Sequence, residues 1–325
     1  MKKVLGISIL LVVVCVISWI IQPKFVTAYN LENIIHWTSL YAIIGIGAAF
    51  VIITGGIDLS IGSVVGMTGC LLAWGLKEYH VSVPVAVGAV LLLSVAIGLI
   101  HGVLIAWMRL PSFIVTLCGM LIYRSLTRWI TDDQALGFSA DLSFWNAMAK
   151  GKIALPLLGG FALPIPFLIM TALALVAGFF LNYTVYGRYL FALGSNEDAA
   201  KYSGIRTDRM TILAYVLCAL MSGIGGVLFA FYYNSMQPSA QGNSYELYAI
   251  AAAVLGGCSL RGGEGSILGV IVGTAVLRVL YNAINVLGIK TQLEFAIIGF
   301  VILAGVLVDE VVKRYALRRK SNVKS

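Results

Sequence analysis

Long apolar runs alternate with short polar breaks along almost the whole chain. A hydrocarbon core about 30 Å thick needs about 20 apolar residues per helix, and most of these runs approach that length. We therefore expect each run to cross a bilayer as a helix. The pattern predicts ten spans, at residues 4–21, 38–54, 60–76, 83–107, 112–130, 164–181, 211–233, 247–260, 265–285 and 293–312.

The composition predicts the same fold class. Hydrophobic residues make up 60% of the chain and charged residues 11%, whereas a soluble protein carries roughly a quarter charged residues. A water-soluble fold would have too few polar side chains to cover its surface. We expect a single all-α domain over residues 1–325, a polytopic transmembrane helical bundle with glycine-interrupted helices and an internal repeat.

The chain has a net charge of +8, and its Lys and Arg residues lie mainly in the breaks between apolar runs rather than on one soluble face. They therefore indicate the membrane topology and not nucleic-acid binding. Placing both termini in the cytoplasm puts the basic segments 182–210 and 313–325 on the cytoplasmic side.

The first run resembles a signal peptide but is long for one, and a retained helix is favoured. The five cysteines lie singly, without metal-site or disulfide spacing.

The stretch 131–163 is too polar and too often interrupted by Pro and Gly to span a membrane. Its larger apolar side chains include Phe138, Leu142, Phe144, Trp145 and Met148. This mixture predicts an interfacial helix on the extracytoplasmic surface, where a partner outside the cell could dock.

Two glycine-rich segments, one in each half of the chain, resemble one another. The first contains Gly55, Gly56 and Gly62, and the second contains Gly256, Gly257 and Gly263. Glycine-interrupted hydrophobic segments in corresponding halves are typical of the broken helices that line a translocation path or gate. Ordinary small-residue packing between helices gives the same spacing and is the alternative.

Asp58 lies between two predicted spans with little polar cover. A charge at membrane depth is unfavourable unless its hydrogen bonds are satisfied. Asp58 could accept hydrogen bonds from backbone N–H groups of the helix that starts near Ser60, capping a kink or holding a gate. Direct contact of Asp58 with a polar solute is the second interpretation.

The cytoplasmic segment 182–210 is long for a connection between bundle helices, which usually take about 2 to 8 residues. It contains Gly194, Ser195, Asn196, Glu197, Asp198, Ala199, Ala200 and Gly204. Ser195 and Asp198 fit a capping box that opens a short helix, with both alanines on one side and Gly204 as its stop. Such a helix suits a coupling element that enters a cleft of a cytoplasmic partner, and a solvated loop is the plain alternative.

The chain has no GxxxxGK[ST] motif, so any ATP must be bound and hydrolysed by a partner subunit. We expect no enzymatic activity and no cofactor in this chain.

Arg278, inside the ninth predicted span, should face protein or water, with Glu294 or Glu246 as its partner. Snorkelling of its side chain to the outer interface is equally compatible with the sequence.

Three segments, 55–66, 194–205 and 255–269, resemble those of the permeases of ribose-, xylose- and arabinose-type ABC importers, within a resemblance that covers residues 23–309. The resemblance implies a permease dimer in the bacterial cytoplasmic membrane, ATP-binding subunits seated on 194–205, and an extracytoplasmic sugar-binding protein. It also implies that a sugar is translocated by an alternating-access mechanism, which is driven by ATP hydrolysis in those subunits. Ser112 departs from the family pattern, which often has a second proline there.

Two other classes of protein fit parts of the pattern. A secondary transporter driven by an ion gradient would also use many spans and broken helices, but it normally needs several embedded carboxylates or cation ligands. Only Asp58 is a ready candidate here. A membrane scaffold or receptor would need neither paired glycine segments nor a long cytoplasmic segment.

Overall fold

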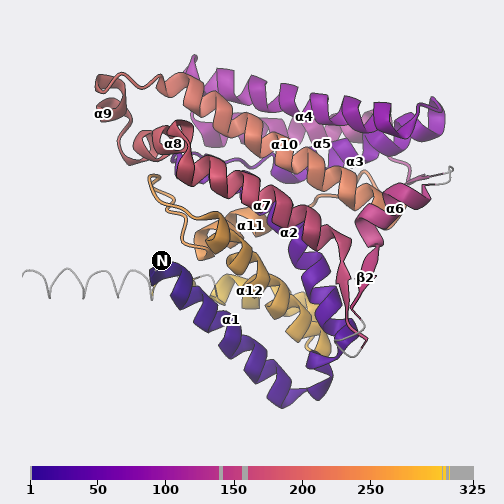
Figure 1. Ribbon diagram of the computed structural model, residues 1–325. Helices are drawn as coiled ribbons and strands as arrows, with labels where there is room; N and C mark the ends of the chain where they lie inside the picture. The colour runs from indigo at the N-terminus through magenta and orange to yellow at the C-terminus, as the bar shows by residue number, and fades with distance from the viewer. Residues whose placement is uncertain (1, 139–141, 156–159, 302, 305–306, 308–325) are drawn as a thin grey trace, which may run out of the picture.

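The computed structural model describes residues 2–138, 142–155, 160–301, 303–304 and 307, which form a bundle of long helices (Figure 1). The elements are α1 (Lys2–Ile21), η1 (Pro23–Val26), α2 (Ala28–Ile53), α3 (Ile61–Glu78), α4 (Val83–Ala106), α5 (Ser112–Ile130), β1 (Leu136–Gly137), α6 (Ser143–Lys150), β2 (Lys152–Ala154), β3 (Ala162–Pro164), α7 (Ile165–Tyr183), α8 (Val185–Ser195), α9 (Glu197–Tyr202), α10 (Thr207–Tyr233), β4 (Ser235–Met236), α11 (Tyr245–Leu255), α12 (Ile267–Val286) and η3 (Thr291–Leu293). A further helix begins at 294.

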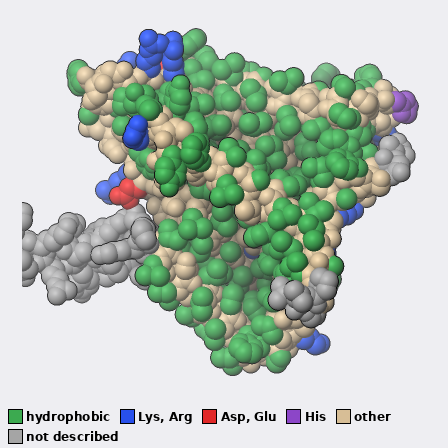
Figure 2. All heavy atoms as spheres, in the orientation of Figure 1, with side chains coloured by type: hydrophobic (Ala, Val, Ile, Leu, Met, Phe, Trp, Pro, Cys, Tyr) green, Lys and Arg blue, Asp and Glu red, His purple; other side chains and the backbone are tan. Residues whose placement is uncertain are grey.

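The described helices confirm a polytopic all-α membrane protein. Seven of them are long and apolar enough to cross a membrane: α1, α2, α4, α5, α7, α10 and α12. Hydrophobic side chains cover most of the face shown in Figure 2, and Lys and Arg side chains lie toward its edges. The predicted basic segment 313–325 lies outside the described residues, as does part of the last predicted span.

Helix α2 is the central element of the bundle. In the most apolar 18-residue stretch of α2, 78% of the residues are buried, against 11% in α1 and 22% in α5. Helix α2 is therefore enclosed by other helices, whereas α1 and α5 lie on the outside of the described bundle. Helix α10 packs on α4, α2 and α3, and α12 packs on α2, α11 and α1. Two short antiparallel ribbons, β1 with β4 and β2 with β3, complete the fold.

Helix α2 begins at Ala28, not near residue 38 as the apolar pattern predicts. The prediction was wrong because polar residues in the first turns resembled a break. Glu32 instead binds the Lys152 Nζ at 2.6 Å and accepts the Ala162 N–H at 2.8 Å. Asn30 exchanges two hydrogen bonds with Asn282. Because these polar groups are satisfied inside the protein, the helix extends through them.

The predicted span 247–260 is wrong as a full crossing. Helix α11 has 11 residues, so at 1.5 Å per residue it is about 16 Å long and covers about half of the hydrocarbon core. The residues before it, 236–244, which we call the re-entrant segment, consist mainly of turns and pack against α3. Irregular backbone is tolerated at membrane depth only where protein or a water-filled cavity surrounds it.

The re-entrant segment lies against a stripe of glycines on α3. A methyl group on Gly62 would overlap the carbonyl oxygen of Gly242, and one on Gly66 would lie 2.7 Å from the carbonyl oxygen of Gln241. Gly69 lies in the same way against the end of the Met236 side chain. At Gly62 and Gly66 the atoms that a side chain would meet include backbone carbonyl oxygens, so only glycine at these two positions lets the segment approach α3 so closely.

Much of the aromatic surface of the 131–163 stretch packs on α10. Phe138 and Trp145 both stack on Phe231, with ring centroids 5.7 and 5.5 Å apart. Phe144, on the other side of α6, is exposed. Residues 139–141 and 156–159 of this stretch lie outside the described residues.

Candidate functional site

Asp58 caps the break between α2 and α3. Its Oδ1 accepts hydrogen bonds from the Ser60 N–H at 2.8 Å and from the Ser60 hydroxyl at 2.6 Å. The side chain is buried, with 3% of its surface exposed. Asp58 lies two residues before Ser60, the N-cap of α3, so these hydrogen bonds close the turn that leads into the helix, where the helix dipole favours negative charge.

The residue before Asp58 is held by two other helices. The Ile57 N–H donates to the Ser112 hydroxyl of α5 at 3.3 Å, and the Ile57 carbonyl accepts from the Thr116 hydroxyl at 3.2 Å. The Tyr215 hydroxyl of α10 donates to the same carbonyl at 3.5 Å. Proline at position 112 could not accept the first of these bonds, so Ser112 gives this break a contact of its own.

The predicted coupling segment, residues 182–210, meets both glycine segments at one point. We call this point the glycine junction, and it consists of Ile53, Gly55, Gly194, Gly262 and Gly263. The Gly263 N–H donates to the Ile53 carbonyl at 2.9 Å. A methyl group on Gly194 would overlap that carbonyl, and one on Gly262 would lie 2.5 Å from the Gly194 carbonyl oxygen. Gly55, Gly262 and Gly263 all have positive φ. The backbones of three distant segments are thus in direct contact.

The other glycines of the predicted path lie in different places. Gly56 faces the Tyr215 hydroxyl, 2.5 Å from where its Cβ would be. Gly256 packs against Gly269 at the contact between α11 and α12, as small-residue helix packing predicts. Gly257 has φ +92° just after α11 ends. Gly62 belongs to the contact with the re-entrant segment.

The start of the coupling helix differs from the predicted capping box. Helix α8 extends to Ser195, whose hydroxyl donates to the Phe191 carbonyl at 2.9 Å. The N-cap of α9 is Asn196, whose side-chain oxygen accepts the Ala199 N–H at 2.9 Å. The prediction was wrong by one residue because Asn196 adopts the extended conformation that an N-cap needs and Ser195 remains helical.

Helix α9 exposes only one of its two alanines. Ala199 is exposed, whereas Ala200 is 4% exposed and packs inward, so the two do not share an accessible side. Glu197 and Lys201 form an ion pair at 2.6 Å. Gly204, at φ +81°, follows the end of the helix, as the sequence predicts.

At the other end of α2 the structure contains a cavity of about 520 Å³, lined by α2, α10, α11, α12, the re-entrant segment and the residues from 294. Its aromatic walls are Trp37, Tyr41, Tyr233, Tyr245, Tyr248, Tyr281 and Phe295. Polar groups between them come from Asn33, Asn243, Asn282, Asn285, Arg278 and Glu294. Apolar walls with a few convergent polar groups are typical of small-molecule sites.

The sequence-based search missed this cavity. Trp37 and Tyr41 are four residues apart on α2, and Arg278, Tyr281 and Asn285 follow one another at helical spacing on α12. That spacing was the available signal, because it places polar and aromatic side chains on one stripe of an apolar helix. Which helices face one another could not be read from it.

Arg278 lies inside the bundle and does not snorkel, since only 7% of it is exposed. Neither predicted partner pairs with it. Glu294 accepts a hydrogen bond from the Tyr248 hydroxyl at 2.5 Å, and Glu246 lies against Gly62 on α3. The guanidinium instead lies over the rings of Tyr281 and Tyr41, 4.4 and 4.6 Å from their centroids.

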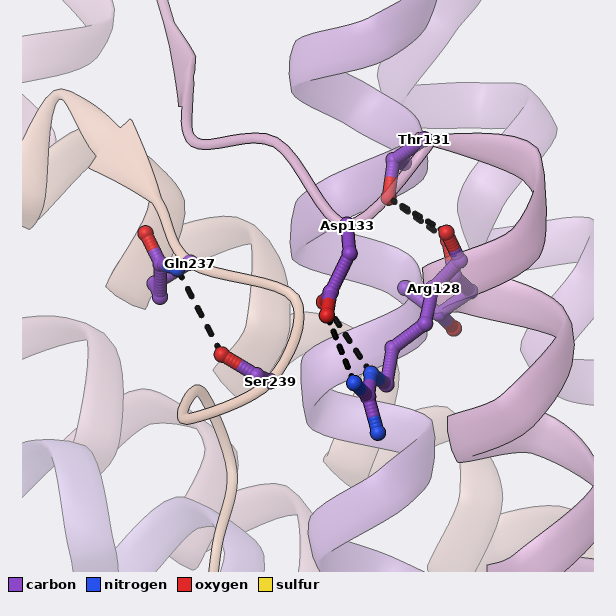
Figure 3. Close-up of polar contacts among 6 residues, drawn as sticks. Arg128, Thr131, Asp133, Gln237 and Ser239 are labelled. Atoms are coloured by element: carbon purple, nitrogen blue, oxygen red, sulfur yellow. Dashed lines mark hydrogen bonds and ion pairs between the residues drawn. The ribbon is translucent and has the colours of Figure 1, made fainter.

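Figure 3 shows the end of α5 beside the re-entrant segment. Arg128 binds Asp133 through its Nε at 3.0 Å and its Nη2 at 2.6 Å. These hydrogen bonds hold the pKa of the Asp133 carboxyl below its usual range. In the re-entrant segment, the Gln237 side-chain amide donates a hydrogen bond to the Ser239 hydroxyl at 3.4 Å. The pair at the end of α5 is largely exposed and lies outside the cavity.

The chain matches, over residues 30–306, the family described as branched-chain amino acid transport system / permease component. It belongs to this permease family. The chain is also similar to the ribose import permease protein RbsC of Escherichia coli K12, which is 40% identical over 304 residues, covering 92% of this chain and 91% of RbsC. The resemblance to sugar permeases that the glycine and coupling segments indicate is thereby confirmed.

Two further relatives from Escherichia coli K12 are also sugar permeases. The D-allose transport system permease protein AlsC is 31% identical over 308 residues, covering 94% of this chain and 91% of AlsC. The xylose transport system permease protein XylH is 29% identical over 360 residues, covering 95% and 91%. No solved structure matches the chain.

Proposed function

We propose that the chain translocates a ribose-like or other monosaccharide and is driven by ATP hydrolysis in separate cytoplasmic subunits. The glycine junction is the observation that supports this most directly. The exposed helix α9 follows Gly194 after only Ser195 and Asn196, and Gly194 is in backbone contact with Ile53 and Gly263. A displacement of α9 by a partner is therefore transmitted to the end of α2 and to the loop after α11.

The surface beside α9 supports the docking of an ATPase subunit. A groove of about 340 Å³ runs between α9 and the ends of α4 and α10, and its walls include Arg109, Glu197, Asp198 and Lys201. Charges of both signs give a partner several polar contacts and fix its orientation. Ala199 leaves the exposed turn of α9 small enough to enter a cleft.

The cavity supports a site for sugar at some distance from the coupling helix. Tyr41 lines the cavity, and Ile53 forms the junction twelve residues later, about 18 Å along α2. In the proposed alternating-access cycle, the sugar occupies the cavity and movement of the junction opens a route past the break at Asp58. Gly55, Gly56 and Asp58 then act as the gate.

The remaining partners follow from the family. A second permease chain, identical or related, would complete the translocation unit, and an extracytoplasmic sugar-binding protein would deliver the solute. The chain would lie in the bacterial cytoplasmic membrane with both termini in the cytoplasm, because Arg188, Lys201, Arg206 and Arg209 cluster at the α9 end. The apolar outer helices would be covered by lipid.

The test is reconstitution with the products of neighbouring genes. The tagged chain is co-expressed with them, purified, and placed in liposomes with a sugar-loaded binding protein. Co-purification of an ATPase, with ATP hydrolysis and uptake both stimulated by the loaded binding protein, is the expected result. A lone permease whose uptake follows an imposed ion gradient would refute the proposal and establish a secondary transporter instead.

A further inference from the structure

Arg278 is a buried cation without an anionic partner among the described residues. It lies within α12, and no described carboxylate approaches its guanidinium within ion-pairing distance. Its Nε is buried without a hydrogen-bond partner. A charge of this kind inside a membrane span is unfavourable unless something else stabilises it.

Three aromatic rings provide part of that stabilisation. The guanidinium carbon is 4.4 Å from the centroid of Tyr281, 4.6 Å from Tyr41 and 5.5 Å from Trp37. Cation–π contacts of this length are attractive, most of all where water is excluded. They also fix the plane of the guanidinium, so that the fork of N–H donors is held in place before any ligand arrives.

The Nε of this fork has no acceptor in the described part of the protein, yet Arg278 lines the cavity. Glu294 lines the same cavity, and the Tyr248 hydroxyl donates to it at 2.5 Å. The described walls therefore carry one positive and one negative group in separate positions. Such walls suit a solute that is neutral overall and both accepts and donates hydrogen bonds, as sugar hydroxyls do.

We infer that Arg278 binds the transported solute, donating a pair of hydrogen bonds to two neighbouring hydroxyl oxygens of a neutral sugar while Tyr41 and Tyr281 hold the guanidinium in place. This inference rests on the proposed function and adds to it the residue that orients the sugar. A planar fork makes two parallel hydrogen bonds to adjacent oxygens, which an ammonium group cannot do with the same geometry.

The experiment measures uptake of D-ribose, D-xylose and D-allose by proteoliposomes that contain the whole complex. Arg278→Gln should raise the KM for the transported sugar about 10- to 100-fold, the range covered by a hydrogen bond to a charged group. Arg278→Lys keeps the charge without the fork and should recover only part of this loss. Basal ATP hydrolysis reports on assembly, and Arg128→Gln, which removes an exposed cation outside the cavity, is the matched control.

An assembled Arg278→Gln complex with wild-type KM would overturn the inference while leaving the proposed function intact. If Arg278→Lys restored the wild-type KM, the pair of hydrogen bonds would be refuted. If gluconate inhibited uptake more strongly than the three sugars do, the inference that the solute is neutral would be refuted. If Arg278→Gln does not assemble, Tyr281→Leu decides, because a raised KM supports the inference and an unchanged one overturns it. A wild-type complex that transports none of the sugars overturns the proposed function and this inference with it.

Discussion

Replacing Gly194 by alanine adds one methyl group where α8 meets the end of α2. The position is helical, so alanine is compatible with the local backbone and gains helix propensity, about 1 kcal/mol over glycine. The new Cβ, however, would overlap the Ile53 carbonyl oxygen and lie 2.5 Å from the Gly263 nitrogen. Both are backbone atoms, so relief requires α8 to move away from the junction.

Gly178 provides the matched control. It lies in α7, and a Cβ built there meets nothing within 4 Å. Gly178→Ala therefore gains a similar propensity without overlap, and the difference between the two variants isolates the overlap. Overpacking of one methyl group typically destabilises by about 1–3 kcal/mol. We expect Gly194→Ala to unfold about 1–5 °C below Gly178→Ala, given the size of the chain.

The assay has a thermal and a functional part. Unfolding of both variants is followed in the same detergent, and uptake per ATP hydrolysed is then measured in the reconstituted complex. Separation of α8 from Ile53 should lower uptake per ATP in Gly194→Ala and leave Gly178→Ala unaffected. Equal melting temperatures together with equal uptake per ATP would refute the glycine junction as the mechanical link.

Three further outcomes are expected. Ala199→Arg should leave membrane insertion intact and abolish co-purification of the ATPase, since the side chain is exposed; unchanged association would exclude docking on α9. Asp58→Asn should fold, because its side-chain oxygen still accepts from Ser60, but should lower uptake; wild-type uptake would show that the charge has no transport role. Asn196→Ala should destabilise α9 by about 1 kcal/mol, seen as faster amide exchange at Ala199, and unaltered exchange would contradict the cap.

Much of the fold was predictable because hydrocarbon thickness sets the length of a spanning helix. Helices α4 and α5 match the predicted runs 83–107 and 112–130 to within about a residue. Helix α2 does not, because Glu32 reads as polar in the sequence and is satisfied by Lys152 and Ala162, which lie 120 and 130 residues away. Local hydropathy contains no information about such a partner.

The candidate site was predictable where its contacts are local. The cap on Asp58 and the stop at Gly204 depend on residues a few positions away, and both were recognised. The cavity depends on side chains from four helices and from the residues after η3, so it required the packing of the bundle. The re-entrant segment was missed because its polar, glycine-containing sequence reads as a surface loop, and its close packing on α3 depends on glycines that are distant in the sequence.

The separation of cavity and junction along α2 has a practical consequence. Tyr41 belongs to one and Ile53 to the other, so the side chains that would select the solute and those that would receive the work of ATP hydrolysis are different sets. Each set can change while the other is kept. Under the proposed function, exchanging cavity residues on α2 and α12 would change the sugar that is transported without altering the contacts that couple the chain to an ATPase.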